Sequence, residues 1–283
     1  MSVVTRFAPS PTGYLHLGHA YAALVAFGIA RERGGRFLLR MEDIDRGRCR
    51  AEFAAAIEDD LSWLGIAWDG GVRTQSAHFD DYRAALARLE AMELIYPCFC
   101  TRAAIKAELD AAAAAPHDAP PVYPGTCRNL SADERQARIR QGLSYALRLD
   151  VAKAQAKTGP LFWEDEIKGA MEAAPTRHGD VVLARKDTPT SYHLAVTVDD
   201  ALQGVTLVTR GADLFAATDL HRLLQALLGY PAPRYHHHKL LTDASGKRFA
   251  KRDQAVTLRG LRAIGKTPAE VRAMAGFTPG PGS

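Results

Sequence analysis

Strand, helix and strand signals alternate over the first forty residues, and this order constrains the fold more than any other feature of the chain. A short apolar strand is expected over 3–8, and apolar residues recur with helical spacing from about 19 to 33, until Gly34 and Gly35 end the pattern. Residues 36–41 (RFLLRM) then indicate a buried strand. This spacing predicts a right-handed βαβ unit, so we expect an α/β fold of the Rossmann type with a doubly wound parallel sheet.

The rest of the chain divides into an interruption and a return to α/β signals. Helices are expected at 51–64 and 80–93, followed by a segment rich in alanine and proline that holds three of the four cysteines. Strand signals resume at 145–149 and 181–184, and a further strand expected at 205–209 precedes a helix from about 214 to 228. We therefore predict a first half of a Rossmann catalytic domain over 1–96, an insertion with a zinc site over 97–180, a second Rossmann half over 181–242, and a basic loop with a short C-terminal segment over 243–283.

Bulk composition limits the class of protein. The chain has 283 residues, of which 47% are hydrophobic and 24% charged, which suffices for a packed core. No apolar run reaches the length of a membrane span, and the N-terminus lacks the pattern of a secretory signal. We therefore expect a cytoplasmic protein that does not bind membranes. We also expect a monomer. A formal net charge of +4 fits a polyanionic ligand but does not demand one.

The loop between the first strand and the first helix, RFAPSPTGYLHLGH over residues 6–19, indicates a nucleotide site. Its position places backbone N–H groups and the positive end of a helix dipole at the carboxyl edge of the sheet, where phosphate binds well. His16 and His19 lie three apart and should face the same side, so that both can donate hydrogen bonds to a phosphoryl oxygen. Gly18 would let an adenine ring approach the backbone. The alternative is a pair of ordinary histidines at a helix start.

An acidic segment ends the second predicted strand at the same edge of the sheet. A carboxylate at this edge can hold the α-ammonium group of an amino acid, and the position of Glu42 favours a functional role for its side chain. The alternative is a solvated turn of mutually paired charges, which we prefer for Asp45 and Arg46.

Three clustered cysteines, Cys98, Cys100 and Cys127, indicate a metal site, because disulfides are rare in cytosolic proteins. Structural zinc takes four ligands in a tetrahedron, and these cysteines are one ligand short. His117, Tyr123 or water are the candidates for the fourth position. The alternative is a group of buried thiols without a metal.

A basic stretch near the C-terminus, residues 247–252 (KRFAKR), follows a turn that contains glycine. Cations on a loop can hold a pyrophosphate leaving group while the α-phosphate is attacked. A solvated basic turn is the alternative for Lys247 and Arg252. The preceding run, residues 236–238 (HHH), should alternate across a strand, and we expect no metal site there.

Residues 6–19 resemble the HIGH motif of class I aminoacyl-tRNA synthetases, in the form of the glutamyl/glutaminyl branch. The basic stretch resembles the KMSKS motif of that family, with Lys251 at its principal lysine and Ala250 in place of a serine. This resemblance implies ATP as a substrate with Mg²⁺, and an activation step catalysed by His16, His19 and Lys251. It implies ATP contacts by His16, Gly18, His19 and Lys251, and glutamate contacts by Arg6, Phe7, Ala8, Pro9, Ser10, Glu42, Tyr192 and Arg210.

The cysteine pattern, C-x-C followed by Y-x-x-x-C, is similar to that of the glutamyl-queuosine tRNA(Asp) synthetases, which consist of the catalytic domain alone. The similarity implies one structural Zn²⁺ held by Cys98, Cys100, Tyr123 and Cys127. Only about thirty residues follow Lys251, fewer than an anticodon-reading domain needs. The resemblance therefore implies a ligase that activates L-glutamate with ATP and transfers it to queuosine in the anticodon of tRNA(Asp).

Three alternatives to this function are open from the sequence. The first is a truncated glutamyl-tRNA synthetase that charges a tRNA 3′ end. The second is a non-catalytic RNA-binding paralogue, for which Ala250 is the supporting residue. The third is a nucleotidyltransferase of the same superfamily, which would not need the predicted glutamate residues.

Overall fold

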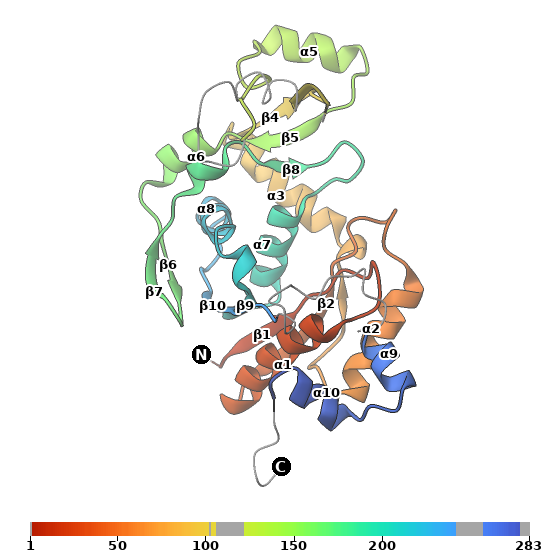
Figure 1. Ribbon diagram of the computed structural model, residues 1–283. Helices are drawn as coiled ribbons and strands as arrows, with labels where there is room; N and C mark the ends of the chain where they lie inside the picture. The colour runs from red at the N-terminus through yellow and green to blue at the C-terminus, as the bar shows by residue number, and fades with distance from the viewer. Residues whose placement is uncertain (1, 102, 106–121, 242–256, 278–283) are drawn as a thin grey trace, which may run out of the picture.

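The computed structural model describes residues 2–101, 103–105, 122–241 and 257–277 (Figure 1). The predicted βαβ unit is present, with β1 (Val4–Phe7), α1 (Leu17–Glu32) and β2 (Arg36–Met41). β1 and β2 are parallel, and β3 (Arg73–Thr74) continues the sheet beside β2. A Cβ atom at Gly35 would lie 2.1 Å from the carbonyl oxygen of Val3, so only glycine lets the chain turn from α1 into β2 at this point.

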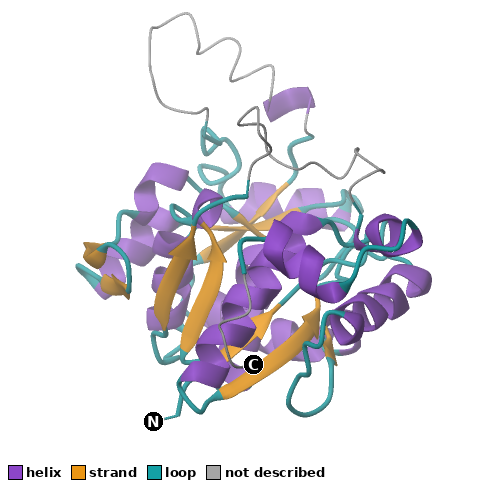
Figure 2. Ribbon diagram, turned by 60° about the horizontal axis from the view of Figure 1, so that its bottom comes forward, coloured by secondary structure: helices purple, strands orange, loops and turns teal. Residues whose placement is uncertain are grey.

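The second half of the parallel sheet consists of β9 (Leu207–Gly211), β10 (Arg234–His238) and β6 (Phe162–Asp165), with β7 (Gly169–Glu172) antiparallel at the edge. The two halves meet where the amide of Thr206 donates to the carbonyl of Val4 at 3.0 Å. The parallel strands lie among helices, as Figure 2 shows. The expected Rossmann-type α/β fold is therefore confirmed.

Helices contribute to two of the hydrophobic clusters in the described chain. In the first, α1 packs with β2, α2 (Ala51–Trp63), α9 (Leu258–Ala263) and α10 (Pro268–Met274). In the second, α3 (Phe79–Ala91) packs with α7 (Tyr192–Leu202) and α8 (Thr218–Leu227). Short 3₁₀ helices are η1 (Gln75–Ala77), η2 (Pro175–His178) and η3 (Ala212–Leu214). No helix of the described chain is long and apolar enough to cross a membrane.

The insertion forms its own antiparallel sheet at one end of the molecule (Figure 1). This sheet contains β4 (Ile95–Cys98), β5 (Ala146–Leu149) and β8 (Val182–Ala184), with α5 (Ala132–Arg140) and α6 (Val151–Thr158) nearby in the chain. Residues 103–105 are helical, and the rest of the alanine-rich segment lies outside the described residues.

Two strands pair across the division that we expected at residue 180. β6 precedes that position but pairs with β10 of the parallel sheet, whereas β8 follows it but pairs with β5 of the insertion. The division into four parts remains a proposal, and these two pairings bear on its second boundary, at residue 180.

Candidate active site

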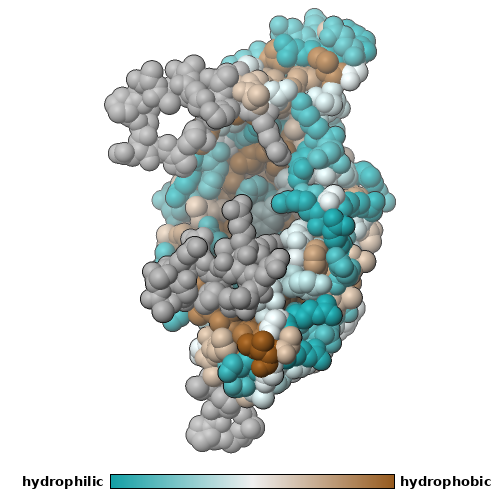
Figure 3. Space-filling view, turned by 45° about the vertical axis from the view of Figure 1, so that its right-hand side comes forward, coloured by the Kyte–Doolittle hydropathy of each residue, from teal (hydrophilic) through white to brown (hydrophobic). Residues whose placement is uncertain are grey.

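A cavity of about 350 Å³ lies where the carboxyl ends of β1 and β9 meet, the edge at which parallel α/β sheets commonly bind ligands. It gathers every residue that the resemblance assigned to glutamate, together with His19. In the space-filling view, the surface is hollowed between the insertion sheet and the half that carries α1 and α2 (Figure 3). The cavity is lined by Arg6, Phe7, Ala8, Pro9, Ser10, His19, Ala22, Glu42, Tyr192, Thr209, Arg210, Gly211, Asp213 and Leu214.

Glu42 directly follows β2 and supplies a carboxylate to this cavity. Its side chain is 10% exposed, and its Oε1 atom lies 3.5 Å from Nη2 of Arg40. Burial raises the pKa of Glu42, although Arg40 and Arg6 act in the opposite direction. A nearby cation would favour the ionised form of this carboxyl group, and the α-ammonium group of an amino acid is such a cation.

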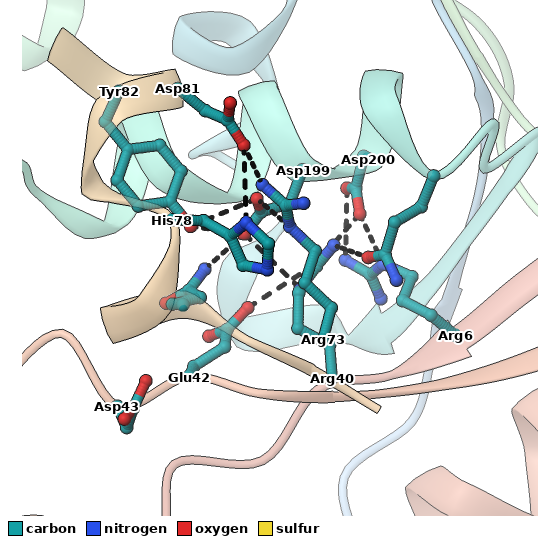
Figure 4. A network of polar contacts seen from close by, with 12 residues as sticks. Arg6, Arg40, Glu42, Asp43, Arg73, His78, Asp81, Tyr82, Asp199 and Asp200 are labelled. Carbon is teal, nitrogen blue, oxygen red and sulfur yellow. Dashed lines mark hydrogen bonds and ion pairs between the residues drawn. The ribbon is translucent and has the colours of Figure 1, made fainter. Parts of the chain in front are cut away.

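Buried ion pairs join the strand ends to α7 (Figure 4). Nε of Arg6 lies 2.9 Å from Oδ1 of Asp200, and Nη1 of Arg6 donates to the carbonyl of Thr209 at 3.0 Å. Arg40, which is fully buried, also lies 2.9 Å from Asp200. Burial acts to raise the pKa of Asp200, but Arg6 and Arg40 hold it below its ordinary value. These contacts fix Arg6 at the cavity wall.

The charges of this network do not balance among themselves. Three guanidinium groups meet four carboxylates, and Glu42 has only the 3.5 Å contact with Arg40 among the described residues. Glu42 is therefore the least compensated anion, which suits it to a cationic group of a substrate. The members are Arg6, Arg40, Arg73, Glu42, Asp81, Asp199 and Asp200 (Figure 4).

Arg210 brings a guanidinium from β9 to the same cavity. Its described hydrogen-bond partners are uncharged side chains: Thr218 at 2.6 Å, His221 at 3.0 Å and His237 at 3.1 Å. Arginine carries five N–H donors, so these three bonds leave two donors for a ligand. A planar pair of donors suits a carboxylate group.

Tyr192 begins α7 and separates the first cavity from a second one of about 260 Å³. Ser10 and Glu42 also line both cavities. Burial raises the pKa of Tyr192, so its hydroxyl group stays neutral and can donate a hydrogen bond. The shared wall would allow two substrates to meet.

His16 and His19 cap the first turn of α1 reciprocally. Nδ1 of His16 accepts from the amide of Gly18 at 3.1 Å, and Nδ1 of His19 accepts from the amide of His16 at 3.2 Å. Their rings stack with centroids 3.8 Å apart, so the two side chains do share one side of the helix. Because Nδ1 is the acceptor in each neutral ring, the ring proton lies on Nε2 in both histidines.

Gly18 has a steric role that the sequence did not indicate. A Cβ atom there would lie 3.1 Å from Cε1 and 3.2 Å from Nδ1 of His16, so a side chain would press on the capping ring. The adenine contact of Gly18 remains a prediction. His19 lines the first cavity, whereas His16 and Gly18 are not among its described lining residues.

Lys251 and Ala250 lie outside the described residues, so the expected pyrophosphate contact remains a prediction. The next described residue is Thr257, which forms a β-bridge with His16. The amide of Leu258 donates to the carbonyl of Leu15 at 2.8 Å. The start of α9 is therefore tied to the start of α1, beside the capping histidines.

The clustered cysteines meet in the insertion. The Sγ atoms of Cys98, Cys100 and Cys127 lie within 4.8 Å of one another, and those of Cys100 and Cys127 are 3.4 Å apart. The phenol oxygen of Tyr123 lies 3.4 Å from Sγ of Cys98 and 3.6 Å from Sγ of Cys100. Tetrahedral zinc with bonds of about 2.3 Å to sulfur and about 2.0 Å to oxygen requires S···S separations of ~3.8 Å and S···O separations of ~3.5 Å. The four side chains therefore fit one zinc ion, and His117 lies outside the described residues.

The chemistry of this donor set also fits a dication. Burial raises the pKa of Cys100 to about 11, and burial is also the main cause that raises the pKa of Tyr123. The amide of Cys127 donates to the phenol oxygen of Tyr123 at 2.9 Å, which helps to stabilise a negative charge there. A metal ion favours the thiolate and phenolate forms and so offsets the cost of burial.

Asp199 and Asp200, the acidic pair of α7 that anchors the arginines of the site, were not predicted from the sequence. The signal was present, because two successive aspartates in an otherwise apolar helix (YHLAVTVDDAL) are buried only where cations meet them. Thr209, Gly211 and Asp213 were also missed as lining residues. They follow from the position of Arg210, since they are its neighbours in the chain.

Comparisons with known proteins point to one family. The catalytic domain of class I tRNA synthetases (E and Q) matches residues 2–274. A glutamyl-Q tRNA(Asp) synthetase from Rhodobacter capsulatus is 49% identical, covering 97% of this chain and 100% of that relative, and one from Symbiobacterium thermophilum is 46% identical, covering 94% and 83%. The crystal structure of glutamate-tRNA synthetase from Elizabethkingia anophelis matches with a TM-score of 0.82 at 26% identity, covering 97% of this chain and 61% of that one. The chain therefore belongs to the glutamyl-Q tRNA(Asp) synthetases, within the class I tRNA synthetases of the E and Q type.

Proposed function

We propose that this chain activates L-glutamate with ATP and transfers the glutamyl group to queuosine in the anticodon of tRNA(Asp). The observation that carries the proposal is a single cavity with two complementary charges. Arg210 keeps two N–H donors for a carboxylate, and Glu42 is an under-compensated carboxylate for an ammonium group. Glutamate offers both groups, as a γ-carboxylate at the end of its side chain and an α-ammonium on its Cα atom.

Activation would form a mixed anhydride. An oxygen of the α-carboxylate attacks the α-phosphorus of ATP, a P–O bond forms, and the bond to the bridging oxygen breaks as pyrophosphate leaves with the electron pair. The Nε2–H groups of His16 and His19 would stabilise charge on the phosphoryl oxygens, and Lys251 would stabilise the leaving group. Mg²⁺ bound to the ATP phosphates would offset part of their charge.

Transfer would use the second cavity. A hydroxyl oxygen of the queuosine cyclopentene ring attacks the activated carbonyl carbon, an ester forms, and AMP leaves while the hydroxyl proton passes to solvent or phosphate. The second cavity shares Ser10, Glu42 and Tyr192 with the first, which supports the placing of the nucleoside next to the adenylate. A nucleotide of the anticodon loop can be splayed out to reach it.

Pyrophosphate exchange and tRNA labelling test this function in one series. With ATP and no tRNA, we expect exchange with glutamate and none above background with glutamine or aspartate. With labelled glutamate and queuosine-containing tRNA(Asp), we expect label that survives removal of the 3′ CCA end. Label that is lost with the CCA end would instead identify a charging enzyme. Absence of both exchange and label would contradict any ligase function and favour a non-catalytic RNA-binding protein.

We also propose that Cys98, Cys100, Tyr123 and Cys127 hold one structural zinc ion. Cys100→Ser is expected to remove most of the bound metal, because zinc binds a serine hydroxyl far more weakly than a thiolate. The metal-to-protein ratio from atomic emission should fall from about one to near zero, on the basis of a single four-ligand site. Tyr123→Phe keeps three thiolates and should retain zinc with lower affinity.

Cys49→Ser is the matched control, since Cys49 is a half-buried cysteine outside the cluster. Its metal content should equal that of the unmodified chain. If Cys100→Ser and Cys49→Ser retain the same metal-to-protein ratio, the zinc proposal is wrong. We further propose that the chain acts as a monomer in the cytoplasm, where ATP and tRNA are available, and a molar mass from light scattering would test the monomer.

A further inference from the structure

Arg210 differs from the other buried arginines of the site in its counter-charges. Arg6 and Arg40 each lie 2.9 Å from a carboxylate oxygen of Asp200. Arg210 is 6% exposed, and no described carboxylate lies within 4.0 Å of its guanidinium nitrogens. A buried cation without an anionic partner is costly, so this arrangement points to an anion that the described chain does not itself provide.

Neutral groups of α8 and β10 surround the guanidinium of Arg210 instead. Its Nε donates to Nε2 of His237 at 3.1 Å, and its Nη1 lies 3.0 Å from Nδ1 of His221. Its Nη2 donates to Oγ1 of Thr218 at 2.6 Å, and its central carbon lies 5.3 Å from the ring centre of Tyr235. The side chain is therefore held in place from several directions.

The donor properties of arginine fix the tautomer of each histidine. A guanidinium only donates, so Nε2 of His237 is unprotonated, and its Nδ1–H faces Oδ2 of Asp165 at 2.7 Å. By the same reasoning, Nδ1 of His221 is unprotonated, and its Nε2–H faces Nδ1 of His193 at 3.2 Å. Both rings are thus neutral acceptors toward Arg210.

The pKa values of these rings agree with the neutral state. Burial and Arg210 lower the pKa of His237 to about 4, although Asp165 acts in the opposite direction. Burial and Arg210 also lower the pKa of His221 well below its ordinary value. Near neutral pH, the two histidines therefore hold Arg210 without adding or cancelling charge.

We infer that His237 and His221 are positioning residues that aim Arg210 at the substrate γ-carboxylate and leave its positive charge uncompensated for that group. Asp165 holds His237 in the required tautomer, as a carboxylate commonly does for a functional histidine. This inference rests on the proposed function, because it assigns Arg210 to glutamate. It adds the two histidines to the determinants of glutamate binding.

Substitution of each histidine by asparagine or by glutamine distinguishes the roles of its two ring nitrogens, because each amide reproduces the position of only one of them. Glutamine places its amide near the position of Nε2 of a histidine, whereas the shorter asparagine places it near Nδ1. At position 237 the nitrogen that faces Arg210 is Nε2, so His237→Gln should keep the acceptor and His237→Asn should lose it. At position 221 the facing nitrogen is Nδ1, so His221→Asn should keep the acceptor and His221→Gln should lose it.

The expected result is a crossed pattern in the KM for glutamate, measured by pyrophosphate exchange. His237→Asn and His221→Gln should each raise this KM by about tenfold or more, the effect of losing one hydrogen bond to a charged group. His237→Gln and His221→Asn should remain within about threefold of the unmodified chain, since the acceptor is kept. The KM for ATP should stay unchanged in all four variants. His236→Asn, on the other face of β10, is the control and should have no effect.

A merely structural role would give a different result. If both amides at one position raise the KM equally, or if the KM for ATP rises in parallel, the positioning role is refuted. Calorimetric titration of the same variants with glutamate gives the comparison without catalysis, so a failure of exchange does not prevent the test. Loss of exchange with normal glutamate binding would count against the proposed function alone. An unmodified chain that binds no glutamate would overturn the inference as well.

Discussion

Lys251→Ala is expected to slow glutamate-dependent pyrophosphate exchange by about a hundredfold to a thousandfold, the usual effect of removing one group that stabilises transition-state charge. Negative charge moves onto pyrophosphate as its bond to the α-phosphorus breaks, and the lysine of the basic stretch is the cation that the family resemblance assigns to it. The loss should appear in kcat, because the interaction strengthens in the transition state.

Two further variants make this prediction specific. Lys247→Ala removes a cation of the same basic stretch, and it should change the rate by less than about threefold because a solvated charge has a weak effect. Lys251→Arg keeps the charge with a different shape and should give an intermediate rate. Equal losses for Lys247→Ala and Lys251→Ala would mean that the stretch acts through its total charge. A normal rate for Lys251→Ala would contradict its catalytic role.

Arg210→Gln is expected to reduce kcat/KM for glutamate by about a thousandfold, because two hydrogen bonds between charged groups contribute about 1.5–3 kcal/mol each. The preference for glutamate over glutamine should fall with it. A fixed cation discriminates strongly against an amide, since the neutral amide would leave the cation unpaired in a buried site.

The measurement compares exchange with glutamate and with glutamine at several concentrations of each. Arg222→Gln is the matched control, because Arg222 lies on α8 outside the cavity and donates to the carbonyl of Phe162. It should leave both amino-acid kinetics unchanged. An unchanged KM for glutamate in Arg210→Gln would show that Arg210 does not bind the γ-carboxylate. Arg6 would then be the candidate for that role.

The local features of this protein could be predicted from short stretches of sequence. The spacing of His16 and His19 placed both rings on one side of α1, and glycines 34 and 35 marked its end. The apolar run of 36–41 indicated β2. Such features depend on backbone sterics and on side chains a few residues apart, so a short stretch contains the information.

The electrostatic environment of the site depended on contacts that are distant in sequence. Arg6 meets Asp200 across 194 residues, and Arg210 is held by His221 of α8 and His237 of β10. Helix and strand signals predicted these elements, but not which of their polar groups would face one another. A polar group is buried at low cost only where a partner forms a hydrogen bond or an ion pair with it. That partner has no fixed spacing in the sequence.

The sequence by itself therefore determined the βαβ start, the candidate nucleotide loop and the metal-type cysteine cluster. Only the tertiary structure decided that β6 pairs with β10, that β8 pairs with β5, and that one arginine of the site keeps uncharged partners while the others meet carboxylates. Local order follows from steric preferences that each residue carries with it. Strand pairing and charge compensation follow from removing many groups from water together, which is settled only when the whole chain packs.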